Sequence, residues 1–262
     1  MRSSTIPSLR AQGGASVLSA AWRAVPSVLL WAAVAVLTIA VALLEWTWVV
    51  AAGWIDRQRR VPHAISVCWG LALVALATGG RVTVHGRRYL SGQRAAVLIA
   101  NHQSLVDIMA LYALRRQFKW VAKSSLFRVP FLGWAMSASG YIRLERGRHG
   151  SIRNAYADAA RYLAEGVSVL FFPEGTRSHT DEMLPFKNGA FKLALDTGAP
   201  VIPIVLRGTR DFLVRGSWLF RFGGRIRLTV LEPIDVSGYR PDEAARLRDD
   251  ARRRIADVLH EA

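Results

Sequence analysis

The chain has 262 residues, which is enough for one sizeable domain with additional segments. It carries 35 Lys and Arg against 19 Asp and Glu, a formal net charge of +16, and 52% of its residues are hydrophobic. A basic chain attracts polyanions, and basic charge combined with high hydrophobicity favours a membrane surface over nucleic acid. The single cysteine, Cys68, excludes an internal disulfide, and no Cys or His residues have the spacing of a zinc site.

The first 80 residues are predicted to form a basic tail followed by membrane-anchoring helices. Residues 1–24 carry three arginines among Ser and Gly, a composition typical of a disordered tail. An uncharged apolar run over 28–44 follows, and Glu45 is the first charge after it. The run is long enough to cross a bilayer or to lie in one leaflet; the alternative is a buried core helix. Together with a shorter apolar stretch over 64–78, the run over 28–44 predicts hydrophobic membrane-anchoring helices over 25–80.

From residue 81 onward, strand-like and helix-like segments alternate. Short apolar segments typical of strands lie at 82–85, 95–100, 118–123, 141–146, 167–172, 201–206 and 226–231. Ser104 and Ser151 are expected to cap helices, and a short helix interrupted by Pro130 is expected over 126–136. Helical periodicity also covers 190–195 and returns after Pro241. This alternation predicts an α/β domain over 81–262, with a largely parallel or mixed sheet flanked by helices.

The polar residues that follow the strand at 95–100 form the first candidate site. His102 and Asp107 lie five residues apart across the turn into the next helix. A neutral imidazole suits the removal of a proton from a hydroxyl, and a carboxylate on its other nitrogen fixes its tautomer. The pair predicts a general base oriented by an aspartate. The alternative is a turn in which the aspartate makes only local hydrogen bonds.

A second polar loop, Glu174-Gly175-Thr176-Arg177, follows the strand at 167–172. The planar fork of an arginine matches the oxygens of a phosphate, and Glu174 could accept a hydrogen bond from a substrate hydroxyl or hold Arg177. Both loops follow the carboxyl ends of predicted strands, which is where open α/β sheets bind ligands. The alternative is an ordinary turn with a surface ion pair.

Two further groups could complete the site. Lys123 and Arg146 close predicted strands and could point into the same crevice, with Arg143 and Arg148 nearby; each could equally be a solvated surface charge. The apolar residues over 126–134 could line a groove for an acyl chain, dip into a membrane, or pack in the core.

Taken together, four motifs resemble those of the glycerolipid acyltransferase family, whose best-known type is 1-acyl-sn-glycerol-3-phosphate (lysophosphatidate) acyltransferase. The segment 101–107 matches the first motif, 140–146 resembles the second, 172–178 matches the third residue for residue, and 201–204 resembles the fourth. Four motifs in the right order make a specific resemblance over about residues 57–231. Arg143 is a departure, because its place in the second motif is usually apolar.

The resemblance implies an O-acyltransferase of phospholipid biosynthesis at the inner membrane, with its active site facing the cytoplasm. The donor would be acyl-CoA or acyl-carrier protein as co-substrate, with no cofactor and no metal. The acceptor would be a lysophospholipid, here lysophosphatidate giving phosphatidate; anionic membrane lipids would be partners, and nucleic acid would not. His102 and Asp107 would be catalytic. The residues that would bind substrate are Lys123, Arg146, Glu174, Gly175, Thr176 and Arg177.

Several alternatives stay open on the sequence. The acceptor could be glycerol 3-phosphate, a lyso-aminolipid or another lysophospholipid. A membrane-anchored binding protein could keep the fold without activity, although the complete His102–Asp107 pair counts against it. A basic nucleic-acid binder would leave the apolar first 80 residues unexplained. Cys68 lies in an apolar run, so we expect an inert buried thiol and no cysteinyl acyl-enzyme.

Overall fold

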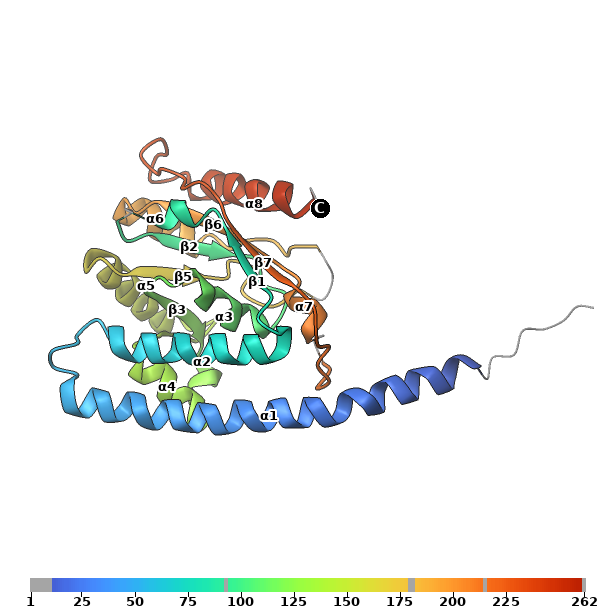
Figure 1. The fold of residues 1–262 in the computed structure, drawn as a ribbon. Helices are drawn as coiled ribbons and strands as arrows, with labels where there is room; N and C mark the ends of the chain where they lie inside the picture. The colour runs from blue at the N-terminus through green and yellow to red at the C-terminus, as the bar shows by residue number, and fades with distance from the viewer. Residues whose placement is uncertain (1–10, 92–93, 179–181, 214–215, 261–262) are drawn as a thin grey trace, which may run out of the picture.

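The computed structural model describes residues 11–91, 94–178, 182–213 and 216–260. Two helices, α1 (Ala11–Ala52) and α2 (Arg60–Thr78), run side by side along one edge of an α/β domain (Figure 1). Because α1 begins at Ala11, the disordered tail expected over 1–24 is wrong for 11–24, where alanines favour a continued helix. Residues 1–10 of that expected tail lie outside the described residues.

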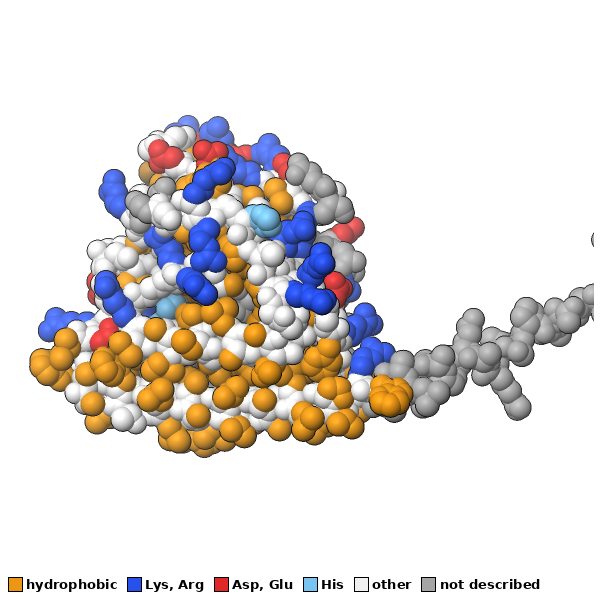
Figure 2. All heavy atoms as spheres, viewed as in Figure 1, with side chains coloured by type: hydrophobic (Ala, Val, Ile, Leu, Met, Phe, Trp, Pro, Cys, Tyr) orange, Lys and Arg blue, Asp and Glu red, His pale blue; other side chains and the backbone are white. Residues whose placement is uncertain are grey.

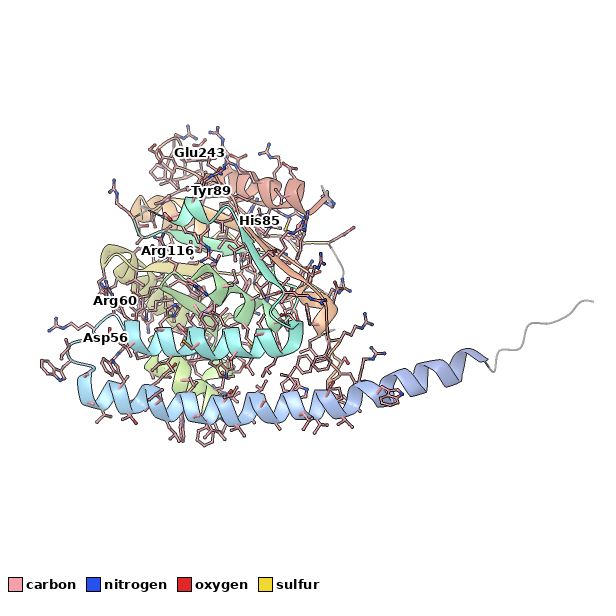
Figure 3. The ribbon with its side chains drawn as sticks, in the orientation of Figure 1. Asp56, Arg60, His85, Tyr89, Arg116 and Glu243 are labelled. Carbon is pink, nitrogen blue, oxygen red and sulfur yellow. The ribbon has the colours of Figure 1, made fainter. Side chains whose placement is uncertain are left out.

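The turn between the two helices is fixed by Asp56. Its carboxylate accepts the N–H groups of Arg60 at 2.8 Å and Val61 at 2.9 Å, which are otherwise unpaired at the start of α2. Figure 3 shows Asp56 and Arg60 together at this end of the molecule. A polar turn therefore connects the two apolar helices where they pack against each other.

One side of α1 is apolar and exposed, and it forms a continuous surface along an edge of the molecule (Figure 2). Its large exposed side chains are Trp22, Val25, Val28, Leu29, Val36, Ile39, Leu43, Leu44, Trp46 and Val50. Among the described residues, 22–52 of α1 and the whole of α2 are long and apolar enough to cross a membrane. Glu45 does not face this surface, because it is fully buried against the domain.

The domain is built on a seven-stranded sheet with the order β1-β7-β6-β2-β5-β3-β4. The strands are β1 (Val82–His85), β2 (Val97–Ala100), β3 (Phe118–Lys123), β4 (Ile142–Leu144), β5 (Ser168–Phe171), β6 (Val201–Arg207) and β7 (Ile226–Val230). Neighbouring strands are parallel except β6 and β7, which are antiparallel. The predicted fold class, a mostly parallel mixed sheet, is confirmed.

Helices cover both faces of the sheet (Figure 1). They are α3 (Val106–Leu111), α4 (Leu132–Ala138), α5 (His149–Ala164), α6 (Gly189–Thr197), α7 (Thr209–Phe212) and α8 (Ala244–His260), with 3-10 turns η1 (Arg87–Leu90), η2 (Tyr112–Leu114) and η3 (Ser124–Arg128). In the central strand β2, Leu98 belongs to the apolar core beneath α2 and α3, whereas Val97 and Ile99 belong to the core beneath α5, α6 and α8. Strands buried on both faces explain the uninterrupted apolar segments of the sequence.

The short helix expected over 126–136, with Pro130 interrupting it, is present as η3 and α4 on either side of the proline, since proline breaks helical hydrogen bonding. Two other local expectations need correction. Ser151 does not cap α5, because its hydroxyl accepts the N–H of Glu145 at 2.8 Å. Cys68 is exposed rather than buried, because it lies on the outer stripe of α2 with Ala64.

Candidate active site

The two polar loops of the sequence leave the sheet side by side. Strands β2 and β5 are parallel neighbours, with Ile99 opposite Phe171 in the register. Parallel neighbours end at the same edge of a sheet, so the loop after β2 meets the loop after β5. The N–H of Ser178 donates to the carbonyl oxygen of His102 at 2.9 Å and joins the loops directly.

His102 and Asp107 form the expected pair. Nδ1 of His102 lies 2.8 Å from Oδ2 of Asp107, and the same oxygen accepts the N–H groups of Gln103 at 2.7 Å and Ser104 at 2.8 Å. Asp107 is fully buried at the start of α3, where its Oδ2 is surrounded by these three donors. Because a carboxylate only accepts, Nδ1 of the neutral imidazole carries the proton, and Nε2 is the basic nitrogen.

Aromatic stacking fixes the plane of the imidazole. The ring of Phe172 stacks on that of His102, with centroids 3.9 Å apart and planes inclined by 14°. Trp120 of β3 stacks on the other side of Phe172 at 5.7 Å. The His102 side chain is 14% exposed, so it is held firmly but can still be reached by a substrate. The sequence places Phe172 in the third motif, but its contact with His102 depends on the pairing of β2 with β5.

Glu174 is buried between the two loops. It is 4% exposed, and its two oxygens accept the N–H of His102 at 2.7 Å and of Leu184 at 2.9 Å. Burial raises the pKa of Glu174 to about 7, although both N–H groups favour its charged form. Glu174 thus links the two loops through these backbone N–H groups, and its expected role in substrate binding stays a prediction.

A cavity of about 1020 Å³ opens beside His102. One part of its wall is cationic, and the lining cations include Lys123, Arg146, Arg177 and Lys187. Gly175 and Thr176 also line it. Six of the eight residues expected at the site, His102 among them, therefore share one cavity. The other two, Asp107 and Glu174, are buried behind it.

Lys187 is a lining cation that the sequence did not single out for the site. A Cβ atom at Gly175 would lie 3.1 Å from Nζ of Lys187, and Gly175 has a φ of +74°, where side chains are strained. Glycine thus allows the lysine to pass close over the loop. Of the other arginines considered, Arg143 lies over the ring of Phe127 at 4.8 Å and Arg148 pairs with Glu145 at 3.0 Å.

The rest of the cavity wall is apolar. It is formed by α1, α3 and the segment from η3 to α4, through residues such as Val34, Ile39, Ile108, Met109, Leu126, Phe131 and Met136. The apolar residues over 126–134 thus contribute both to this wall and, through Phe127, to the core. Helix α1 closes the cavity on the side of the exposed apolar surface. The cavity therefore has both charged and apolar lining residues.

Neither Ser104 nor Cys68 is placed to act as a nucleophile in the cavity. Ser104 is buried, and its hydroxyl donates to the carbonyl oxygen of Leu213 at 3.2 Å. Cys68 is not one of the described residues that line the cavity. The same described residues contain no group of three His, Cys, Asp or Glu side chains that could hold a metal ion.

Comparison with known proteins agrees with this arrangement. The family model described as Acyltransferase matches residues 81–207, the part of the chain that carries both loops. The chain is 36% identical over 207 residues to the chloroplastic 1-acyl-sn-glycerol-3-phosphate acyltransferase BAT2 of Brassica napus, covering 78% of this chain and 58% of the relative. It is 35% identical to the 1-acyl-sn-glycerol-3-phosphate acyltransferase of Haemophilus influenzae, covering 63% of this chain and 70% of the relative. The chain belongs to the glycerolipid acyltransferase family.

The fold of this acyltransferase is shared by a solved structure. The crystal structure of the 1-acyl-sn-glycerophosphate (LPA) acyltransferase PlsC from Thermotoga maritima superposes with a TM-score of 0.64 and 25% identity, over 86% of this chain and 95% of that chain. The acyltransferase spans 55% to 60% of the length of its plant and algal relatives.

Proposed function

We propose that this acyltransferase moves a fatty acyl group from a thioester donor to the free hydroxyl of lysophosphatidate, forming phosphatidate. The observation that carries the proposal is the position of His102, which faces a single cavity with a cationic wall and an apolar wall. A lysophosphatidate has the matching parts: a phosphate, a hydroxyl and a long chain. The names of the similar proteins support the same acceptor.

The proposed chemistry is direct transfer with His102 as the base. Asp107 holds Nδ1, so Nε2 accepts the proton of the acceptor hydroxyl as its oxygen attacks the thioester carbonyl carbon. The new C–O bond forms, the C–S bond breaks, and the departing thiolate takes the proton back from the imidazolium. Asp107 stabilises the imidazolium while it exists. No protein nucleophile takes part.

The cationic wall is proposed to hold the acceptor phosphate. Lys123, Arg146 and Arg177 come from β3, the end of β4 and the loop after β5, and all three line the cavity. Lys187 adds a fourth positive charge, and the hydroxyl of Thr176 lines the same wall. A phosphate dianion is matched by several cations arriving from different directions, with arginine supplying paired donors.

The apolar wall and α1 are proposed to keep the reaction at a membrane surface. The exposed face of α1 would lie in the cytoplasmic leaflet of the inner membrane, with the cavity mouth toward the cytoplasm. The net charge of +16 would favour anionic lipids and would also suit the phosphates of acyl-CoA or the acidic surface of an acyl-carrier protein. Apart from this donor, the proposed reaction uses no cofactor.

An acceptor panel tests the proposal. Purified enzyme in lipid vesicles is given labelled acyl-CoA or acyl-carrier protein with lysophosphatidate, glycerol 3-phosphate or lysolipids that lack a phosphomonoester. We expect lysophosphatidate to be preferred, and Arg177→Ala to lose roughly 10- to 100-fold of that preference because a charged hydrogen bond to phosphate is removed. Arg148→Ala, outside the cavity wall, is the matched control. Equal use of acceptors without the phosphate by the wild-type enzyme would contradict the choice of acceptor.

A further inference from the structure

The C-terminal helix α8 is hydrogen-bonded to a segment that passes beside the candidate active site. This segment, residues 182–188, is called the strap below. Arg252 donates from Nη2 to the carbonyl oxygen of Met183 at 3.2 Å, and Arg248 donates from Nη1 to Oδ1 of Asn188 at 2.8 Å. Positions four apart lie on one face of a helix, so one face of α8 holds both ends of the strap.

The strap holds the loop that carries Glu174. The N–H of Leu184 donates to Oε2 of Glu174 at 2.9 Å, and the N–H of His102 donates to Oε1 at 2.7 Å. A continuous series of contacts therefore leads from the guanidinium of Arg252 to the main chain of the proposed base. Glu174 is its central member, because its carboxylate accepts one N–H from the strap and one from His102; Ser178 makes a second link, with its hydroxyl donating to the carbonyl oxygen of Glu182 at 2.7 Å and its N–H to that of His102 at 2.9 Å.

The strap also forms part of the site itself. The N–H of Lys187 donates to the carbonyl oxygen of Pro173 at 2.9 Å, and the Lys187 side chain lines the cavity. A displacement of the strap would thus change the backbone partner of Glu174 and the position of one lining cation together.

The side chain of Arg252 is drawn inward, unlike its neighbours on α8. Its Nε is buried and has no hydrogen-bond partner among the described residues, whereas Arg253 and Arg254 are exposed. Placing part of a guanidinium out of water costs free energy, which a surface arginine avoids. Burial raises the pKa of the Glu174 carboxyl, the two backbone N–H groups lower it, the negative charge of Asp107 raises it, and the positive charge of Arg252 lowers it.

We propose that Arg252, assisted by Arg248, is a positioning residue for acyl transfer, which holds the strap against Glu174 and so fixes the orientation of His102. The proposal rests on the proposed function, in which His102 is the base. It concerns a part of the chain beyond residues 81–207, the segment that the family model matches. The C-terminal helix thereby contributes to the site without touching the substrate.

Three variants of α8 test this role by kinetics. Arg252→Met removes the donor but keeps a long side chain, Arg252→Lys keeps the charge and a donor, and Arg254→Met is the matched control on the exposed face. We expect Arg252→Met to lower kcat roughly 10- to 100-fold with little change in the KM for lysophosphatidate, because the base is displaced while the phosphate wall remains. Arg252→Lys should recover most of kcat, and Arg254→Met should equal the wild type.

Amide hydrogen exchange supplies a readout that does not depend on activity. In Arg252→Met, peptides covering 101–104 and 182–186 should both exchange faster than in the wild type, and in Arg254→Met neither should change. Faster exchange in the strap alone, unchanged exchange in both peptides, or a raised KM at constant kcat would overturn the proposal. Failure of the wild-type enzyme to acylate lysophosphatidate would contradict the proposed function. The exchange result would still show whether Arg252 stabilises the main chain around His102. If Arg252→Met did not fold, the same exchange comparison would be made with Arg248→Met, which removes the other hydrogen bond between α8 and the strap and should also raise exchange in both peptides.

Discussion

At the scale of single residues, the site contains two buried acidic side chains, Asp107 and Glu174, whose hydrogen-bond donors are arranged differently. Asp107 accepts three donors on one oxygen beside the imidazole, whereas Glu174 divides its oxygens between two loops. The first arrangement was predictable, because His102 and Asp107 are neighbours across one turn. The second was not, because Leu184 and His102 lie 10 and 72 residues from Glu174 in the chain, and His102 reaches Glu174 through the pairing of β2 with β5.

The charge of Glu174 gives a prediction for Glu174→Gln. A carboxylate can accept both backbone N–H groups, whereas the amide of glutamine can accept only one. We expect a kcat about 10-fold lower at pH 8, where the wild-type carboxyl with its pKa of about 7 is mostly charged, and a smaller difference at pH 6, where it is mostly protonated. Steady-state kinetics at the two pH values measure the change.

The same substitution should change how the free energy of unfolding depends on pH. The pKa of Glu174 is about 7 in the folded chain against 4.5 for the free side chain, so between these values the folded state binds more protons than the unfolded state. Wild-type stability should therefore fall relative to Glu174→Gln as the pH rises from 4.5 to 7, by at most about 3 kcal/mol. Denaturant unfolding at pH 5 and pH 7.5 tests this, and a difference that grows in the opposite direction would contradict it.

At the scale of elements, the helix pair is attached to the domain through buried polar groups. Glu45 of α1 accepts the hydroxyls of Ser66 on α2 at 2.7 Å and Ser139 after α4 at 3.2 Å. Nζ of Lys119 at the start of β3 donates to the carbonyl oxygen of Ser139 at 2.7 Å. Glu45, the first acidic residue after the apolar run, thus marks the side of α1 that faces the domain. Hydrogen bonds of this kind select one docking position of a helix where apolar contacts alone would allow sliding.

Lys119 gives a test of this attachment. Burial lowers the pKa of Lys119 to about 7, and the positive charges of Arg59 and Arg161 act in the same direction. Between pH 7 and 10.5 the unfolded chain binds more protons than the folded chain, so stability rises with pH. We expect wild-type stability to increase relative to Lys119→Met between pH 7 and 9, by up to about 3 kcal/mol.

Thermal unfolding of the two proteins across this range measures the effect. A constant difference between them would show that Lys119 is charged in the folded enzyme at every pH tested, and would contradict the account of its burial.

The elements themselves were largely predictable. Short segments rich in apolar residues and bounded by turns predict strands, and each of the seven expected strands is present within a few residues of its place. The strand order was not predictable, because β2, β5 and β6 are brought together by packing between segments up to 105 residues apart. The exposure of Cys68 was not predictable either, because it depends on which face of α2 packs against the domain.

At the scale of the whole molecule, apolar and basic surfaces are separated. Figure 2 shows hydrophobic side chains along the edge formed by α1, and Lys and Arg side chains over the domain above it. Exposed Trp134, Trp218 and Phe222 of the domain extend the apolar surface. A protein of this shape is suited to lie on a membrane with its domain in water.

Charged residues on the apolar edge should prevent membrane binding. Leu29 and Leu43 are 65% and 56% exposed on α1, and burying each in lipid would contribute about 1.5–3 kcal/mol. We expect the double variant Leu29→Glu with Leu43→Glu to bind vesicles of anionic phospholipid at least roughly 100-fold more weakly than the wild type. Ala245→Glu, at an exposed position of α8, is the matched control. Sedimentation with vesicles measures binding, and unchanged binding of the double variant would show that α1 does not form the membrane contact.

The central claim, that His102 takes the proton from a lipid hydroxyl, is tested most directly by the rate at which His102→Ala transfers a labelled acyl group from acyl-CoA to lysophosphatidate. General-base catalysis contributes roughly 10²- to 10⁴-fold, so the variant should retain at most about one hundredth of the wild-type kcat while its unfolding transition stays cooperative. A His102→Ala enzyme that turns over at the wild-type rate would contradict the account.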